Sequence, residues 1–331
     1  MEKPRHIAVI GGGSWATALA KLLLNNVEEI SWYIRKPERI DAFRSEGHNP
    51  MYLSDVAFDV ERIRFSADIN EAVKDADTLV VAVPSPYLTG ELDKLTESIA
   101  DKTVVSAVKG IVPSVNKIVS HYFIDKYDVD PHNMIVIGGP CHAEEVALGR
   151  LSYLTIGCHQ HKKAEAFAQC IGSRAMRTVI SGDVDGIEYA AVLKNVYAIA
   201  SGIIHGMKAG DNLLAVLISN AIREMRRFVN AACPMRRDID DSAYLGDLLV
   251  TAYSRFSRNH NFGSMIGRGY SVKAAQMEME MVAEGFYGTK CIHEINRSLK
   301  VEMPILDCVY NILYGMVPAS RAIPAVAETL D

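Results

Sequence analysis

The first half of the chain alternates short apolar runs, rich in β-branched residues, with longer segments of mixed polarity. The apolar runs lie at residues 6–10, 30–34, 78–83, 103–107, 134–137, 152–158 and 176–179. Runs of this length predict buried strands, and intervening segments such as 88–100 and 161–171 predict helices. Strands that are apolar on both faces and alternate with helices are typical of a doubly wound α/β fold with a parallel sheet.

The second half of the chain has a different pattern, because the strand-like runs stop after Gly182. From about Asp185 to the end the sequence predicts helices, including residues 213–232 and 271–286. A chain of 331 residues is also longer than a single core usually supports. We therefore expect an α/β domain of the Rossmann type at residues 1–182 and an all-helical domain at residues 183–331.

The predicted helix at residues 187–207 is apolar on nearly every side, yet it contains one lysine, Lys194. A helix of this kind belongs inside a domain, where an ammonium is costly unless it faces a polar cleft. At about 100° per residue, one stripe would contain Lys194, Ser201, His205 and Asn212, and this stripe is a candidate wall of an active site. The alternative is that the lysine stem lies on apolar surface and its ammonium reaches water.

A glycine-rich turn follows the first predicted strand and precedes the first helix. Gly11, Gly13 and Ala16 occupy the positions of the G-x-G-x-x-G/A pattern. Gly11 allows a tight turn, Gly13 lets a pyrophosphate approach the backbone, and Ala16 lets helix and strand pack closely. Free N–H groups at the helix start would then bind the phosphates. This placement predicts dinucleotide binding.

Two basic residues follow the second predicted strand. NAD-specific sites place an acid about 20 residues beyond the glycines, where it binds the ribose 2′-hydroxyl. This chain has Arg35 and Lys36 there instead. Cations would attract a 2′-phosphate, so we expect NADPH or use of both NADPH and NADH. The alternative is a solvated basic turn before Pro37.

Further candidate residues lie where later strands end, since ligands of such sheets bind beyond the carboxyl ends of the strands. Lys109 follows one strand beside a glycine, and Gly139 and Cys141 follow another. A cation at the mouth of the sheet can contact substrate, cofactor or both. The alternative is that Lys109 is an ordinary loop lysine.

The helical half contains two unusual polar segments. Asp247 begins an apolar helical turn, where it is either a functional carboxylate or a helix cap. The segment Ser257-Arg258-Asn259 offers a planar fork of donors beside a neutral donor, which suits a phosphate group. An exposed polar loop would have a similar composition.

Composition and charge narrow the class of protein. A net charge of −5 gives no electrostatic reason to expect nucleic-acid binding. The six cysteines show neither C-x-x-C nor zinc-type spacing, so we expect free thiols and no metal site. The apolar segment near the N-terminus is too short for a signal peptide, and no uncharged run is long enough for a membrane span. We expect a cytoplasmic protein without stable membrane insertion.

Taken together, the segments resemble the bacterial NAD(P)-dependent glycerol-3-phosphate dehydrogenase family. The similarity runs in order through GGGSWATALA, VKG, GGPCHAEEVA, LKNVYAIASGI, GDN, LGDLLVT, SRNHNFG and VAEG. It implies reduction of dihydroxyacetone phosphate to sn-glycerol 3-phosphate, the backbone of phospholipids, with Lys194 as general acid and base. Many apolar residues and methionines in the helical half also make a homodimer plausible.

The resemblance and the motifs together assign roles to individual residues. The catalytic group would be Lys194, Asp247 and Lys109. The cofactor contacts would be Gly11, Gly13, Ser14, Trp15, Arg35, Lys36, Lys109, Ala143, Arg258, Val282 and Glu284. The substrate contacts would be Lys109, Gly139, Cys141, Lys194, Asp247, Ser257, Arg258 and Asn259.

The chain departs from the family pattern at several polar positions. Cys141 and His142 replace the usual Ser-Phe pair, and a thiol is a poorer hydrogen-bonding group than a hydroxyl. His205 stands where the family has an acid, and SRNHNFG replaces SRNRRFG. Two other readings stay open: a related two-domain dehydrogenase that acts on a hydroxy acid, and a non-catalytic regulator that binds NADPH.

Overall fold

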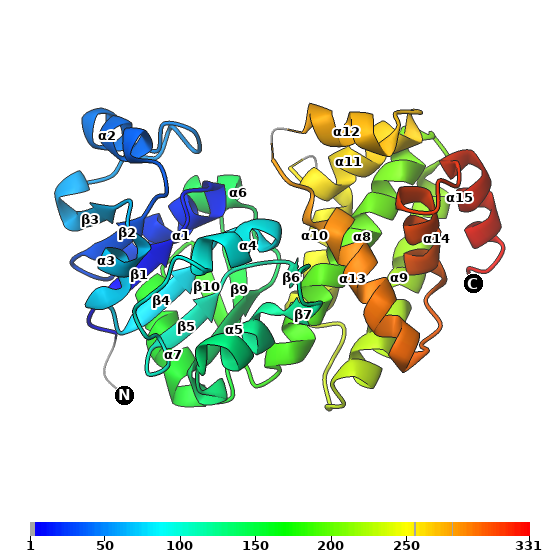
Figure 1. Cartoon of the computed structure of the whole chain (residues 1–331). Helices are drawn as coiled ribbons and strands as arrows, with labels where there is room; N and C mark the ends of the chain where they lie inside the picture. The colour runs from blue at the N-terminus through cyan, green and yellow to red at the C-terminus, as the bar shows by residue number, and fades with distance from the viewer. Residues whose placement is uncertain (1–3, 255, 280) are drawn as a thin grey trace. The chain divides into compact units, whose positions relative to one another are not determined.

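The structure, a computed structural model, describes residues 4–254, 256–279 and 281–331. The chain divides into two compact units (Figure 1). The first contains the residues up to Val108 together with Val119–Val184, and the second contains Lys109–Ile118 together with Asp185–Asp331.

One segment, Lys109–Ile118, lies outside the α/β domain to which the sequence assigned it. It contains the short antiparallel strands β6 (Ile111–Val112) and β7 (Lys117–Ile118). Asn116 donates a hydrogen bond of 2.6 Å to Glu294 of the second unit. These contacts bridge long sequence separations, so the local hydrophobic pattern gave no sign of them.

The first unit is built on an eight-stranded sheet with the strand order β10-β9-β8-β5-β4-β1-β2-β3. Its strands are β1 (Ile7–Ile10), β2 (Ile30–Tyr33), β3 (Ile63–Ser66), β4 (Thr78–Val81), β5 (Thr103–Ser106), β8 (Met134–Gly138), β9 (Ser152–Gly157) and β10 (Met176–Ser181). All neighbouring strands are parallel except β8 and β9, which pair antiparallel. The doubly wound sheet is thus confirmed, with one reversal at β9.

Helices connect these strands: α1 (Ser14–Leu24), α2 (Pro37–Glu46), α3 (Ile69–Lys74), α4 (Ser85–Leu92), α5 (Val119–Tyr127), α6 (Ala143–Ala147) and α7 (His161–Ile171). The prediction of a helix at residues 88–100 was wrong in its extent, because α4 begins earlier and ends at Leu92. The side chain of Asn70 accepts hydrogen bonds from the backbone N–H groups of Thr96 and Glu97. This contact stabilises a loop where the local pattern favoured helix.

In the second unit, the described residues after β10 form helices: α8 (Val184–Gly206), α9 (Asp211–Ala232), α10 (Asp247–Tyr253), α11 (Arg258–Gly267), α12 (Val272–Glu278), α13 (Glu284–Leu299), α14 (Pro304–Leu313) and α15 (Ala319–Ala327). Helix α8 is long and apolar enough to cross a membrane, but 94% of its most apolar stretch is buried inside the protein. Its apolar character is that of a core helix, as expected.

The stripe that the sequence placed on this helix is only partly present. Lys194 and Ser201 are buried, but Ser201 donates its hydroxyl to the backbone oxygen of Ala252 and is structural. Helix α8 ends at Gly206, so Asn212 lies on α9 and the proposed stripe stops before it. The wall of four polar residues was therefore a wrong prediction, because Asn212 lies beyond the end of the helix that carries the other three.

Helices α8 and α11 pack backbone against backbone through glycines. Gly202 and Gly206 of α8 face Gly263 and Gly267 of α11. A Cβ atom added at Gly202 would lie 2.0 Å from the backbone oxygen of His260, and one at Gly263 would lie 2.1 Å from a backbone oxygen of α8. No side chain fits at such distances, so this contact fixes α11 relative to α8.

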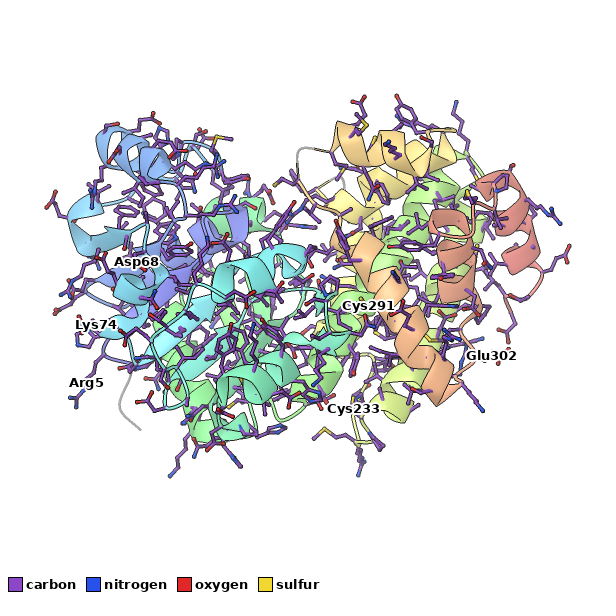
Figure 2. All side chains as sticks on the ribbon, in the orientation of Figure 1. Arg5, Asp68, Lys74, Cys233, Cys291 and Glu302 are labelled. Carbon is purple, nitrogen blue, oxygen red and sulfur yellow. The ribbon has the colours of Figure 1, made fainter. Side chains whose placement is uncertain are left out.

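All six cysteines are free thiols, as the spacing predicted. Figure 2 shows two of them, Cys233 after α9 and Cys291 on α13, at separate places in the second unit. Burial raises the pKa of the Cys291 thiol to about 11, which keeps it protonated and unreactive at neutral pH.

Candidate active site

The glycine turn of the first unit has the geometry that a dinucleotide needs. Gly11 has a φ of +121°, and a Cβ atom there would lie 2.8 Å from the backbone oxygen of Ala82. Gly13 is the N-cap of α1 and has open space around the position of a Cβ atom. Among the described residues no side chain caps α1, and a helix start of this kind is a favourable place for an anion. The adjoining Ser14 and Ala16 are buried against the sheet.

Two side chains that the sequence analysis did not identify hold this turn in place. Trp32 donates its indole N–H to the backbone oxygen of Gly11 at 2.7 Å. Asn49 donates to the backbone oxygen of Gly12 at 3.2 Å and to the hydroxyl of Thr17 at 2.8 Å. Because these contacts span more than twenty residues of sequence, only the fold reveals them.

Arg35 and Lys36 follow β2 as predicted, and Arg35 is fixed by a carboxylate. Its guanidinium lies 3.0 Å from Glu91, which also accepts hydrogen bonds from Tyr33 and Lys94 at 2.6 and 2.9 Å. Burial alone would raise the pKa of Glu91, but these three donors outweigh it and hold the pKa below its ordinary value. Arg35 itself remains 59% exposed, so it can still contact a ligand.

The segment after β8 contains the other candidates of the first unit. Gly139 has a φ of +107°, and a Cβ atom there would lie 3.0 Å from the backbone oxygen of Tyr153. The thiol of Cys141 donates to that same oxygen at 3.1 Å. Ala143 is buried at the start of α6. Cys141 is thus held against β9, an arrangement that a serine hydroxyl could also adopt.

In the second unit, Lys194, Asp247 and Lys109 meet in one buried cluster. Lys194 is 4% and Asp247 1% exposed, and the ammonium of Lys194 donates directly to the Asp247 carboxylate. Lys109 lies 3.3 Å from the other carboxylate oxygen and is 18% exposed. The structure therefore brings together the three residues that the sequence proposed as catalytic. The alternative, in which the ammonium of Lys194 reaches water, was wrong.

The protonation of this cluster follows from its burial. Burial lowers the pKa of Lys194, the carboxylate of Asp247 opposes that change, and the positive charge of Lys109 lowers the pKa further, to about 7. Burial alone would raise the pKa of Asp247, but the effect of the two lysines is larger and holds the pKa of the carboxyl below its ordinary value. At neutral pH the carboxylate is therefore charged, and the amine exchanges a proton readily.

The backbone around Asp247 also contributes to the geometry of the cluster. A single π-helical turn, Ser242–Gly246, leads into α10, and such turns are frequent at functional sites. Asp247 does not cap α10, so the capping interpretation was wrong. Thr251 donates its hydroxyl to the backbone oxygen of Asp247 at 2.6 Å, and Asn195 donates to the backbone oxygen of Lys109 at 2.8 Å. Sequence reasoning missed both residues, although Asn195 stands beside Lys194 in the same apolar helix.

The segment Ser257-Arg258-Asn259 forms the start of α11, and so is not the exposed loop that was the alternative. Ser257 caps the helix by accepting a hydrogen bond from the N–H of His260. The side-chain oxygen of Asn259 accepts the N–H of Gly285 at 2.8 Å, which joins the starts of α11 and α13. A Cβ atom at Gly285 would lie 2.6 Å from the backbone oxygen of Asn195. These contacts connect Arg258 to the helix of Lys194.

The predicted cofactor residues divide between the two units. The first unit holds Gly11, Gly13, Ser14, Trp15, Arg35, Lys36 and Ala143, and the second holds Lys109, Arg258, Val282 and Glu284. Glu284 is the first residue of α13, and Val282 precedes its N-cap. The glycine turn can bind a dinucleotide, and the second unit holds an amine that can exchange a proton beside basic and amide donors.

A Rossmann-type sheet with this glycine turn, followed by a helical unit with a buried amine, defines the class of two-domain nicotinamide-dependent dehydrogenases. Residues 6–164 match the profile of the NAD-dependent glycerol-3-phosphate dehydrogenase N-terminus, and residues 183–324 match that of the C-terminus. The chain belongs to the NAD-dependent glycerol-3-phosphate dehydrogenase family.

Individual relatives agree with this assignment along nearly the whole chain. An enzyme of Chlorobium limicola named glycerol-3-phosphate dehydrogenase [NAD(P)+] is 33% identical over 96% of both chains. One of Staphylococcus epidermidis with the same name is 31% identical over 98% of both. The crystal structure of glycerol-3-phosphate dehydrogenase from Coxiella burnetii is 27% identical, with a TM-score of 0.90 over 98% of this chain and 99% of that one.

Proposed function

We propose that this chain catalyses the NAD(P)-dependent interconversion of dihydroxyacetone phosphate and sn-glycerol 3-phosphate, which supplies glycerol backbones for phospholipid synthesis. The observation that carries the proposal is the buried Lys194, whose pKa of about 7 allows proton exchange at neutral pH. Family membership and the glycine turn support the same reaction. Both indicate a nicotinamide dinucleotide as the cofactor.

Lys194 is the proposed general acid in the direction of reduction. When bound, the reduced nicotinamide supplies a hydride to the C2 carbonyl of dihydroxyacetone phosphate. Lys194 donates a proton to the oxygen of that carbonyl as negative charge develops there, and it accepts the proton in the reverse direction. Asp247 orients the amine by direct contact, and Lys109 keeps its pKa low and stabilises negative charge.

The start of α11 is the proposed phosphate site. Arg258 offers a bidentate guanidinium, and the amino group of Asn259 stays a donor when its oxygen binds Gly285. Ser257, Gly139 and Cys141 would complete the substrate contacts. Binding free energy from the phosphate would then orient the carbonyl for reaction. The required phosphate is the feature that distinguishes this substrate from an unphosphorylated hydroxy acid.

For the cofactor, we propose that both NADPH and NADH are used, with NADPH favoured. The contact between Arg35 and Glu91 holds a guanidinium at the end of β2, where the 2′-phosphate of NADPH would lie. Lys36 adds a second cation at the same place. We also propose a cytoplasmic location and a homodimer, both consistent with a dehydrogenase of small phosphorylated metabolites.

The test is an activity assay on the purified chain with dihydroxyacetone phosphate and either NADPH or NADH, followed by absorbance of the reduced cofactor. We expect oxidation of both cofactors, and we expect Lys194→Ala to abolish turnover while cofactor affinity stays unchanged. Lys273→Ala, which removes an exposed lysine of α12, is the matched control. Cofactor binding without turnover would support the non-catalytic regulator instead, and turnover of a hydroxy acid would support the related dehydrogenase.

A further inference from the structure

A cavity of about 700 Å³ lies in the second unit between the end of α8, the start of α9 and the end of α11. Its lining includes Ile204, His205, Lys208, Asp211, Leu214 and Arg268. The volume is within the range of small-molecule sites in proteins. His205 is eleven residues beyond Lys194 on α8, which corresponds to about 16 Å along the helix axis. The cavity is therefore distinct from the lysine and aspartate cluster.

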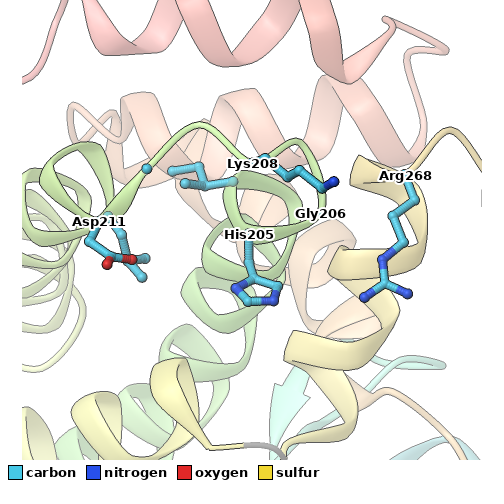
Figure 3. A pocket seen from close by; sticks show the side chains of 8 residues that line it. His205, Gly206, Lys208, Asp211 and Arg268 are labelled. Carbon is cyan, nitrogen blue, oxygen red and sulfur yellow. The ribbon is translucent and has the colours of Figure 1, made fainter.

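Basic side chains from separate segments converge on this cavity. Lys208 follows α8, and Arg268 follows α11. Within the described residues, neither side chain has an ion-pair partner. Two unpaired positive charges that line the same cavity repel each other, and a bound anion would relieve that repulsion. Figure 3 shows the charged ends of Lys208 and Arg268 on the same side of His205, with Asp211 on the opposite side. In the described part of the chain, Asp211 forms an ion pair with neither Lys208 nor Arg268.

His205 adds a hydrogen-bonding group to the lining of the cavity. The imidazole of His205 can donate a hydrogen bond into the cavity. Its ring centroid lies 5.3 Å from that of His260. Burial lowers the pKa of His260, and the proximity of His205 lowers it further.

We propose that this cavity binds a small phosphomonoester other than at the reacting site. Arg268 and Lys208 would contact the phosphate oxygens, because guanidinium and ammonium groups form the strongest hydrogen bonds to such anions. His205 would add a third donor. The organic part of the ester would lie against Leu214 and Ile204, since the cavity is much larger than a phosphate group alone. The proposal does not depend on the substrate assigned above.

Binding is measured by isothermal titration calorimetry with phenyl phosphate as the probe. All proteins in the comparison carry Arg258→Leu, which removes the proposed phosphate contact of the active site. We expect phenyl phosphate to bind this parent, and Lys208→Gln combined with Arg268→Gln to weaken binding by about tenfold or more. Arg226→Gln combined with Lys273→Gln removes the same charge from exposed positions and should change nothing.

Equal affinity in the parent and the Lys208/Arg268 variant would overturn the proposal, as would a parent that does not bind the probe. Inorganic phosphate should bind more weakly than phenyl phosphate, and equal binding would show that the cavity does not recognise an ester. In the otherwise wild-type enzyme, the Lys208/Arg268 variant should leave the KM for dihydroxyacetone phosphate unchanged. A raised KM would place these residues in the substrate site and would also overturn the proposal.

Discussion

The low pKa of Lys194 predicts how the rate in each direction depends on pH. Reduction needs the protonated amine, and oxidation needs the neutral amine. With a pKa of about 7, the protonated fraction falls from about one half at pH 7 to about one hundredth at pH 9. The kcat/KM for reduction should therefore fall about 50-fold over this range, whereas that for oxidation should rise only about twofold.

The informative quantity is the pH at which the slope of each plot of log kcat/KM against pH changes, here called the break. Reduction consumes one proton, so the ratio of the two kcat/KM values must change about tenfold per pH unit whichever residue is the acid. An ordinary lysine, with a pKa of about 10.4, would place the break far into the alkaline range. The rate of oxidation would then rise about tenfold per pH unit between pH 7 and pH 9.

Initial rates at low substrate concentration, measured in both directions from about pH 6 to about pH 10, give the two breaks. Lys109→Met should move both to higher pH, because the charge of Lys109 lowers the pKa of Lys194. Lys273→Met, at an exposed position, should leave them in place. Profiles without a break near pH 7, or a break that Lys109→Met does not move, would refute the assignment of Lys194.

Other predictions test neighbouring parts of the molecule. Between pH 7 and pH 9 the free energy of unfolding in urea should rise by about 2 kcal/mol. The reason is that Lys194 loses its proton in the folded protein over this range but keeps it in the unfolded chain. Lys194→Met should abolish the rise. Arg258→Leu should raise the KM for dihydroxyacetone phosphate at least tenfold, by about 1.5 kcal/mol or more, with little change in cofactor KM; an unaltered substrate KM would remove it from the phosphate site. Glu91→Gln should raise the KM for NADPH roughly fivefold, or about 1 kcal/mol, and leave that for NADH unchanged; equal effects on both cofactors would contradict the role of Arg35. Gly263→Ala should lower the free energy of unfolding by about 1–3 kcal/mol or more, whereas Gly90→Ala, with open space around its Cβ position, should not; equal stability of the two variants would disprove the close contact.

The sequence predicted those features that depend on local pattern. Apolar runs located the strands near the glycine turn, because a strand buried on both faces needs continuous apolar side chains. Lys194 stood out because a charge in an otherwise apolar helix is costly. The glycine spacing likewise identified Gly11, whose positive φ the structure requires. In each case the physical constraint acts on residues that are close together in the chain.

Features that depend on distant contacts could not be predicted in this way. Glu91 binds Arg35 across more than fifty residues, and no local signal marks it. Residues Lys109–Ile118 belong to the second unit because they contact α8 and α13, which lie far away in the sequence. Helix α4 ends at Leu92, and the backbone N–H groups of the following loop donate hydrogen bonds to Asn70, which lies on an earlier helix. Tertiary contacts determined all three outcomes.

The glycine contact between α8 and α11 has a consequence for substrate range. Lys194 lies on one of these helices and Arg258 begins the other, so main-chain contact sets the spacing between proton donor and phosphate site. This spacing selects substrates by the distance between their carbonyl and phosphate groups. It cannot be adjusted by changing the size of a side chain in the contact, because the contact is made by the main chains of both helices. Engineering this scaffold toward a longer phosphorylated ketone would therefore have to move the phosphate-binding residues along α11 and leave the two helices where they are.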